Sequence, residues 1–266
     1  MVRWIFFDIG NVLLIDEPLV ALNWEEIYQA LNDSGRHVTF TELMTQREQV
    51  VQQDQDAAPH MSIGIKLLGQ EGWAEVKKRI KAKVRQDYLH YNFVRMGAAE
   101  VMANLSTRYK LAVAANQPKD VFRKAMEDAG LLGFFDILGI SDEMGLSKPD
   151  PRFFQLLLSQ AGCTASEAIM IGDRIDNDIV PAQKLGMHTI WFNLSPEAQG
   201  YVARSSLEQL YIDSLHRAPS RGTGHPNQQI EPSVTVTSLD QLLAAIESIA
   251  DGPQETSNQG AASLHR

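Results

Sequence analysis

The sequence contains a single cysteine, Cys163, among its 266 residues. One thiol cannot form an internal disulfide or a metal site of several thiolates, and this usage is typical of a reducing compartment. No uninterrupted apolar run approaches the roughly 20 residues that a membrane-spanning helix needs. The acidic Asp8 also comes too early in the chain for the apolar part of a signal peptide. We therefore expect a cytoplasmic protein with no membrane partner.

Positive charge is scarce as well, because 24 lysines and arginines face 33 aspartates and glutamates, which leaves a net charge of -9. General nucleic-acid binders need a basic surface that follows the phosphates, so we expect no nucleic-acid partner. The basic segment 77–85 has another explanation, since Val76, Ile80 and Val84 recur at helical spacing and leave its charges on an exposed face. An acidic protein that handles an anionic substrate must therefore concentrate positive charge locally.

The seven histidines show no metal-ligand spacing, and we assign them no role. The chain has instead several short apolar runs that alternate with segments of helical period. Such alternation is typical of a parallel sheet that helices cover on both faces. The apolar runs span residues 2–7, 110–115, 136–140, 168–172 and 188–192. The sequence thus predicts a doubly wound α/β core.

The alternation breaks between residues 16 and 95, where almost every segment has helical period. A helical block inserted after the first strand predicts a second, smaller domain. Its expected place is above the carboxyl end of the sheet, where open α/β folds bind their ligands. We assign residues 16–95 to this helical cap domain and residues 1–15 with 96–250 to the discontinuous core.

The C-terminal part of the chain is less regular. Residues 196–232 are rich in turn formers, which predicts an irregular excursion from the core. Residues 232–250 follow with the pattern of a last strand and helix. The tail 251–266 has few apolar residues and is expected to be disordered.

Chemically useful side chains follow the predicted strands at their carboxyl ends. Asp8 ends the first strand, Asn116 follows the second, Lys148 comes after the third, and Asp173 follows the fourth. Because the carboxyl ends of parallel strands meet at one edge of the sheet, we expect these side chains to converge. Carboxylates in such a place can hold a hard cation such as Mg²⁺, and a lysine offsets both their repulsion and the charge of a bound phosphate.

A carboxylate can also act as the nucleophile of phosphoryl transfer and form an aspartyl-phosphate that water later cleaves. Mg²⁺ would then neutralise charge on the phosphoryl oxygens. The residues alone therefore predict a metal-assisted phosphoryl-transfer site at the carboxyl edge of the sheet.

Four segments in this order resemble the motifs of the haloacid dehalogenase superfamily, particularly its branch with a helical cap inserted after the first strand. They are FFDIGNVLL, LAVAANQP, GLSKPDP and IGDRIDNDIVPAQKLGM, and the resemblance extends from Met1 to about Phe192. It implies hydrolysis of a small phosphorylated metabolite, with a substrate that the cap selects. The oligomeric state stays open.

The resemblance also implies roles for single residues. Asp8 would be the nucleophile, and Lys148 would steady both Asp8 and the phosphate. Mg²⁺ would be held by Asp8, by the main-chain carbonyl of Gly10 and by Asp173, with Asp178 supporting the metal shell. Two other charged residues nearby are given no catalytic role: Asp176 is expected to face solvent, and Arg174 is expected to form a surface ion pair.

Two positions depart from the family pattern. Gly10 stands where the family usually has a second aspartate that donates and accepts protons, a function worth about 10²–10⁴-fold in rate. Ala115 stands where a serine or threonine usually binds the phosphate, and the missing hydroxyl costs roughly 1–3 kcal/mol. Asn116, or backbone N–H groups at Ala115, could replace part of that contact. The sequence predicts a weakened active site.

Two alternatives follow from these departures. The chain could bind a phosphorylated ligand or a protein partner without turnover, since both Gly10 and Ala115 weaken catalysis. It could also be a 2-haloacid dehalogenase, because members with that activity lack the second aspartate and use no metal. The acids Asp173 and Asp178 favour the metal-dependent phosphatase.

Overall fold

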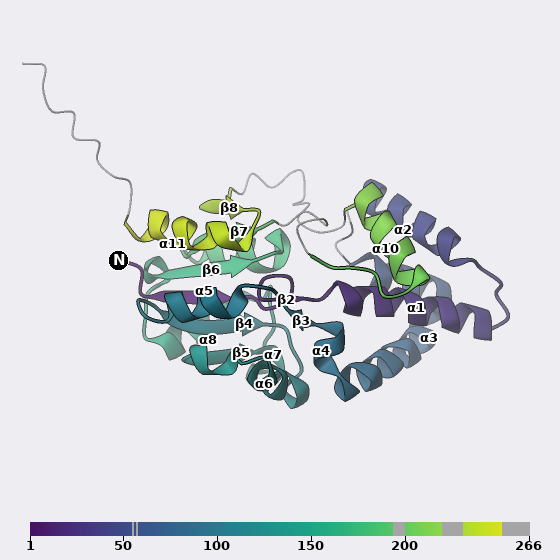
Figure 1. Cartoon of the computed structure of the whole chain (residues 1–266), viewed down its shortest axis with the longest axis horizontal. Coiled ribbons are helices and arrows are strands. Elements are labelled where there is room, and N and C mark those ends of the chain that lie inside the picture. The colour runs from purple at the N-terminus through teal and green to yellow at the C-terminus, as the bar shows by residue number, and fades with distance from the viewer. Residues whose placement is uncertain (55, 57, 194–199, 220–230, 252–266) are drawn as a thin grey trace, which may run out of the picture.

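The structure is a computed structural model that describes residues 1–54, 56, 58–193, 200–219 and 231–251. Its centre is a six-stranded parallel sheet in the order β5-β4-β1-β6-β7-β8 (Figure 1). The strands are β1 (Trp4–Phe7), β4 (Lys110–Ala115), β5 (Ile137–Ile140), β6 (Ala168–Gly172), β7 (His188–Phe192) and β8 (Val234–Val236). The five strands predicted from apolar runs are therefore confirmed, and so is the last strand near the C-terminus.

Helices cover both faces of this sheet because the side chains of each strand alternate between them. In β1, Trp4 and Phe6 are buried on one face and Ile5 and Phe7 on the other. The first face packs against α8 (Pro151–Ala161) and α9 (Val180–Lys184). The second packs against α5 (Ala98–Leu105), α6 (Lys119–Asp128) and α11 (Leu242–Ala250). A short helix, α7 (Ser141–Met144), follows β5. The doubly wound α/β core is confirmed.

Residues between β1 and α5 are almost entirely helical, as the sequence predicts. The helices are α1 (Glu17–Asp33), α2 (Phe40–Asp54), α3 (Pro59–Gln86) and α4 (Tyr88–Tyr91). Figure 1 shows α1, α2 and α3 beyond one end of the sheet. Two short antiparallel strands, β2 (Leu14–Ile15) and β3 (Phe93–Val94), pair where the chain enters and leaves this block. We retain the division into a core and a cap over residues 16–95 as a proposal.

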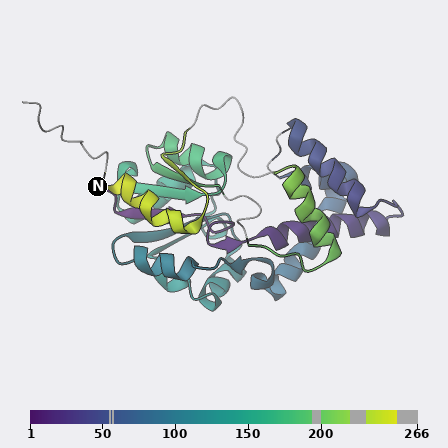
Figure 2. The same ribbon diagram turned by 45° about the horizontal axis from the view of Figure 1, so that its top comes forward.

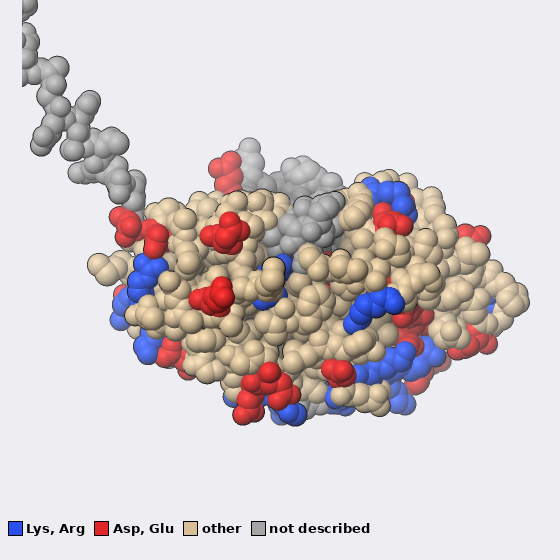
Figure 3. All heavy atoms as spheres, viewed as in Figure 1, with Lys and Arg blue, Asp and Glu red and all other residues tan. Residues whose placement is uncertain are grey.

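The basic segment of α3 lies on the exposed face of an amphipathic helix. Val76, Ile80 and Val84 are buried, whereas the charges beside them form ion pairs such as Lys83 Nζ to Glu26 Oε1 at 2.6 Å. In Figure 3, the lysines and arginines in this part of the surface lie next to acidic side chains. None of the described helices is long and apolar enough to cross a lipid bilayer.

The prediction of an irregular excursion over residues 196–232 is wrong for its middle part. Helix α10 (Ser206–Arg217) lies there and packs against α1 and α2 rather than against the sheet (Figure 2). Its buried side chains Tyr211 and Leu215 are four residues apart on one face, and the turn formers only flank it. Residues 194–199 and 220–230, and the predicted disordered tail from residue 252, lie outside the described part of the chain.

Candidate active site

Asp8 lies at the carboxyl end of β1, between neighbouring strands β4 and β6. Its amide donates to the Ile171 carbonyl at 2.8 Å, which continues the pairing with β6 by one residue. Its side chain is 14% exposed and faces the Nζ atom of Lys148, which lies 2.9 Å from Asp8 Oδ1. The side chain of Lys148 is only 1% exposed. A buried cation thus contacts a partly exposed carboxylate at the centre of the sheet edge.

Asp178 holds the other side of this lysine. Its Oδ1 atom lies 2.6 Å from Lys148 Nζ, and its Oδ2 atom accepts a hydrogen bond from the Arg174 amide at 3.1 Å. Asp178 is carried by a π-helical turn over Ile175–Ile179, and such turns are frequent at functional sites. Gly172 makes this approach possible, because a Cβ atom there would lie 2.4 Å from the Asp178 side chain.

Burial and neighbouring charges shift the pKa values of Asp178 and Lys148. Burial raises the pKa of Asp178 to about 6; the charge of Lys148 opposes this rise and that of Asp8 adds to it. Burial alone would lower the pKa of Lys148, but the carboxylates of Asp178 and Asp8 raise it above its ordinary value. Lys148 therefore stays positively charged, and it neutralises part of the negative charge at the sheet edge.

Three carboxylates form a candidate metal site. Asp8, Asp173 and Asp178 each offer an oxygen, and these three atoms lie within 4.8 Å of one another. Asp173 is buried, and its Oδ2 atom accepts a hydrogen bond from Asn11 Nδ2 at 3.3 Å. Hard oxygen donors of this kind suit Mg²⁺, and one lysine among three carboxylates leaves an excess of negative charge for a cation to offset. The residues present therefore fit Mg²⁺.

Asn116, which is expected to replace part of the missing phosphate contact, also bonds to the backbone of Lys148. Its Oδ1 atom accepts from the Lys148 amide and its Nδ2 atom donates to the Lys148 carbonyl, both at 2.9 Å. This pair of bonds fixes the backbone that carries Lys148, while Asn116 still lines the cavity described below. Ala115 is fully buried at the end of β4 and does not belong to the lining of that cavity.

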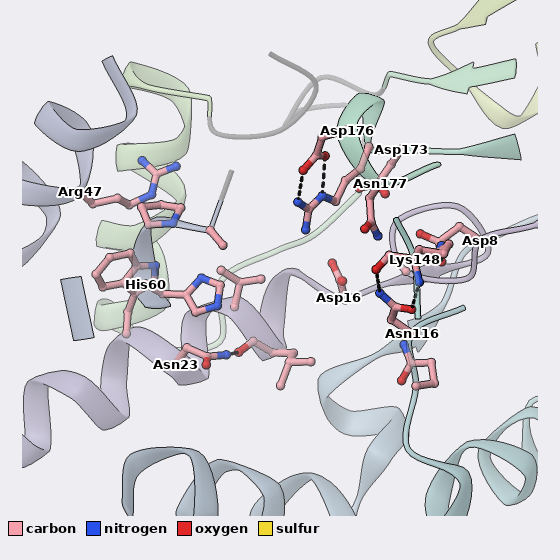
Figure 4. Close-up of a pocket in the computed structure, with 18 residues that line it drawn as sticks. Asp8, Asp16, Asn23, Arg47, His60, Asn116, Lys148, Asp173, Asp176 and Asn177 are labelled. Atoms are coloured by element: carbon pink, nitrogen blue, oxygen red, sulfur yellow. Dashed lines mark hydrogen bonds and ion pairs between the residues drawn. The ribbon is translucent and has the colours of Figure 1, made fainter. Parts of the chain in front are cut away.

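A cavity of about 290 Å³ lies between the sheet edge and the helical block (Figure 4). Its wall on the core side contains the charged residues that the sequence singled out, except Asp178. That wall consists of Asp8, Gly10, Asn116, Gln117, Lys148, Asp173, Arg174, Asp176 and Asn177. The opposite wall consists of Asp16, Leu19, Val20, Asn23, Trp24, Arg47, Ala58, Pro59 and His60. The core-side wall is thus mainly charged and polar, whereas the opposite wall mixes apolar side chains with the charged Asp16 and Arg47.

The expected surface ion pair of Arg174 is confirmed, and its partner is Asp176. The Arg174 Nη2 atom lies 2.6 Å from Asp176 Oδ2, and the Asp176 side chain is 59% exposed. A second bond joins Arg174 Nε to Asp176 Oδ1 at 3.0 Å. Both residues line the cavity, and Asp176 lies outside the candidate metal site, which consists of Asp8, Asp173 and Asp178.

Three residues of the site carry no functional signal that the sequence pattern reveals: Asn11, Asp16 and Arg95. Asn11 has a left-handed backbone (φ 54°), which turns the chain back after Asp8. Arg95 is buried and donates to the carbonyls of Val12 and Asn11 at 3.0 and 2.9 Å, so it fixes this loop. Burial lowers the pKa of Arg95 to about 10, against the opposing charges of Asp16, Asp173 and others.

A signal for Asp16 was present in the sequence. An aspartate followed by Glu17 and Pro18 is a typical start of a helix, and α1 indeed begins there with Asp16 as its N-cap residue. The pattern did not reveal that the same aspartate lines the cavity.

Comparisons with known proteins find relatives in both sequence and fold. A family model described as haloacid dehalogenase-like hydrolase matches residues 2–186. The glyceraldehyde 3-phosphate phosphatase of Methanocaldococcus jannaschii is 26% identical over 198 residues, which cover 71% of this chain and 84% of that protein. The pyrimidine 5′-nucleotidase of Escherichia coli is 28% identical over 204 residues, covering 71% and 85%. The magnesium-bound structure of the HAD-hydrolase YfnB from Bacillus subtilis has the same fold, with a TM-score of 0.62, 18% identity and coverage of 91% and 97%.

Proposed function

We propose that this chain, which belongs to the haloacid dehalogenase-like hydrolase family, hydrolyses a small phosphate monoester with Mg²⁺ as cofactor and Asp8 as nucleophile. The observation that carries the proposal is the contact between the Asp8 carboxylate and the buried Lys148 ammonium in the wall of a cavity. The names of the relatives, a sugar-phosphate phosphatase and a nucleotidase, support a phosphorylated metabolite as substrate.

In the first step, an oxygen of Asp8 attacks the phosphorus atom and the bond to the leaving oxygen breaks. The leaving oxygen takes a proton and departs as an alcohol, and Asp8 is left as an aspartyl-phosphate. In the second step, water attacks the same phosphorus atom, gives up a proton that balances the one taken by the leaving oxygen, and the bond to Asp8 breaks. Inorganic phosphate departs, and the Asp8 carboxylate is restored.

Lys148 stabilises both steps electrostatically, since its ammonium offsets the negative charge that Asp8 and the phosphoryl group bring together. Asp178 and Asn116 hold Lys148 in place from its side chain and its backbone respectively. Asp8, Asp173 and the Gly10 carbonyl would hold Mg²⁺, with Asp178 supporting this shell. When bound, Mg²⁺ supplies positive charge that neutralises the phosphoryl oxygens.

The organic part of the substrate meets the wall that the helical block contributes. Trp24 lines this wall and is fully buried, yet no partner for its indole N–H is found among the described residues. A buried donor without a partner is costly, so a substrate acceptor that reaches this N–H after a small shift of the wall would be bound favourably. We propose that residues 16–95 select the substrate through this wall.

The test measures phosphate release from glyceraldehyde 3-phosphate, phosphoserine, pyrimidine nucleotides, acetyl phosphate and para-nitrophenyl phosphate, each with Mg²⁺ and with a chelator. We expect Mg²⁺-dependent release from at least one compound, and an Asp8→Asn variant should lose it. If the wild-type protein never exceeds Asp8→Asn, the phosphatase proposal fails. In that case, thermal stabilisation by a phosphorylated compound would indicate binding without turnover, and chloride release from a 2-haloacid would indicate a dehalogenase.

A further inference from the structure

We propose that Asp16 is the catalytic proton donor to the leaving oxygen and, in the second step, the proton acceptor from water. This assignment rests on the proposed phosphatase function. Its basis is a close approach: a Cβ atom on Gly10 would lie 2.9 Å from Asp16 Oδ2 and 3.6 Å from Asp16 Cγ. The carboxylate of Asp16 therefore occupies the space that a side chain at position 10 would take.

The glycine at position 10 is not required by its own backbone. Gly10 is absent from the described glycines with positive φ, so an ordinary residue could adopt its conformation. What a side chain there would meet is the carboxylate of Asp16. Position 10 thus has no side chain, and the carboxylate of Asp16 fills the space that such a side chain would need.

The local structure delivers Asp16 to this place. After Asp8, the left-handed Asn11 reverses the chain, and the Asp16 amide donates to Asn11 Oδ1 at 3.3 Å. The pairing of β2 with β3 then fixes the residues just before Asp16. Asp16 is the N-cap residue of α1, but its side chain makes no capping hydrogen bond to that helix. The Asp16 carboxylate therefore does not cap α1.

Other titratable groups of the cavity are less suited to this role. Asp176 forms a two-bond ion pair with Arg174 at the rim. His60 belongs to the opposite wall, where its ring lies 6.3 Å from that of Trp24. Figure 4 shows the Asp16 carboxylate between His60 and Asp8. A leaving oxygen attached to a phosphorus atom at Asp8, with its organic part toward His60, would pass beside Asp16.

The proton balance closes over one turnover. Protonated Asp16 gives its proton to the leaving oxygen as the bond from phosphorus to that oxygen breaks. The resulting carboxylate takes a proton from the water molecule that attacks the aspartyl-phosphate. Asp16 is then protonated again, and no further acid or base is consumed. Proton transfer of this kind contributes about 10²–10⁴-fold in rate.

The experiment compares leaving groups that need a proton with leaving groups that do not. Phosphate release is measured for the wild type, Asp16→Asn and Asp16→Ala with an alkyl phosphate that the wild type accepts, and with acetyl phosphate and para-nitrophenyl phosphate. We expect kcat/KM, which reports the step that releases the leaving group, to fall about 10²–10⁴-fold for the alkyl phosphate and less than about tenfold for the other two. Equal losses for all three, or no loss for the alkyl phosphate, would overturn the assignment.

A double variant tests whether a carboxylate at position 10 can restore the activity that Asp16→Ala loses. Gly10→Asp alone should be impaired, because its Cβ atom meets Asp16. Gly10→Asp combined with Asp16→Ala should recover at least about tenfold over Asp16→Ala with the alkyl phosphate, since a carboxylate returns to the same space. Circular dichroism checks that each variant is folded. Failure of the wild type to turn over any of the phosphates tested would defeat the proposed function itself, whereas normal turnover without leaving-group dependence in the variants defeats only the assignment of Asp16.

Discussion

The side chain of Asp178 lies against the backbone of Gly172, so closely that a Cβ atom on Gly172 would be 2.4 Å from its Cβ, Cγ and Oδ2 atoms. Real Cβ atoms do not tolerate such contacts. The last residue of β6 must therefore be glycine for Asp178 to reach Lys148. This contact couples the end of a core strand to the position of the ammonium group beside Asp8.

The substitution Gly172→Ala should displace Asp178 and, with it, Lys148. We expect the free energy of unfolding to fall by about 1–3 kcal/mol, as for other overpacked sites. We expect kcat with acetyl phosphate to fall at least about tenfold, because Lys148 then supports Asp8 less well. Urea unfolding and phosphate release measure the two effects. Gly133→Ala is the matched control, since Gly133 has no neighbour within 4 Å of an added Cβ and no positive φ; an equal loss there would contradict the explanation.

Magnesium should stabilise the folded protein through the three clustered carboxylates. A ligand that binds only the folded state at about 100 times its Kd adds roughly 2.7 kcal/mol to the free energy of unfolding. We therefore expect the midpoint of thermal unfolding to rise with Mg²⁺ and to return when a chelator is added. The variant Asp173→Asn should lose most of this rise.

Asp176→Asn is the control for the metal prediction. Asp176 lies only three residues after Asp173, but it is paired with Arg174 and is outside the group of carboxylates within 4.8 Å. Its variant should keep the rise in the unfolding midpoint. A rise of the same size in Asp173→Asn as in the wild type would mean that Mg²⁺ binds elsewhere.

The sequence predicted much of the core site because strand order alone brings its residues together. Asp8 and Asp173 end adjacent strands of a parallel sheet, and apolar runs identify such strands reliably enough to place both acids at one edge. The contact of Gly172 with Asp178 was beyond sequence reasoning, because it depends on a π-helical turn that no local pattern indicates. Asp16 was missed for a similar reason. Its place over Gly10 depends on β2 and β3, which pair residues about 80 positions apart in the chain.

Helix α10 shows a different limit of sequence reasoning. Its flanks are rich in turn formers, and these obscured a short amphipathic helix between them. Its stabilising partners come from far away in the chain: Arg47 on α2 is fully buried and donates to the carbonyls of Ser214 and Ala218 at 3.0 and 2.9 Å. Tyr211 donates its hydroxyl to Glu17 on α1 at 2.7 Å. A helix that depends on such contacts has little local signal.

The indole N–H of Trp24 gives a prediction for substrate binding. Trp24→Phe keeps most of the ring but removes the donor. If the substrate accepts a hydrogen bond from this group, KM should rise about 3- to 10-fold with kcat nearly unchanged. The free energy of unfolding should fall only by what the smaller ring costs. No hydrogen bond is lost, because the indole N–H has no partner among the described residues. Trp73→Phe is the control, since Trp73 is buried and lies beside the same His60 ring as Trp24 without lining the cavity. A similar KM in all three proteins would remove Trp24 from substrate recognition.

The pH dependence of stability should report on Glu208, which joins α10 to the segment before it. Burial alone would raise the pKa of Glu208, but hydrogen bonds from the side chain and amide of Arg204 lower it below its ordinary value. Arg204 in turn donates to the His90 carbonyl at 2.8 Å, so the pair also ties α10 to α4. A carboxyl group with a lower pKa in the folded state stabilises the fold above its unfolded pKa, and this contribution is lost as pH falls through the folded pKa.

We therefore expect Glu208→Gln to lower the free energy of unfolding by about 1 kcal/mol at pH 7, the typical value of such a hydrogen bond. The difference from the wild type should persist down to about pH 5 and shrink below the ordinary pKa of glutamate, about 4.3, because the wild-type carboxyl group then gains a proton and loses the same interaction. Urea unfolding of both proteins at a series of pH values between 7 and 3 measures this difference. Glu247→Gln, which breaks the exposed pair with Arg108, should show a much smaller difference at every pH. A difference for Glu208→Gln that stayed constant down to pH 3 would show that packing of the side chain, rather than its charge, links α10 to α4.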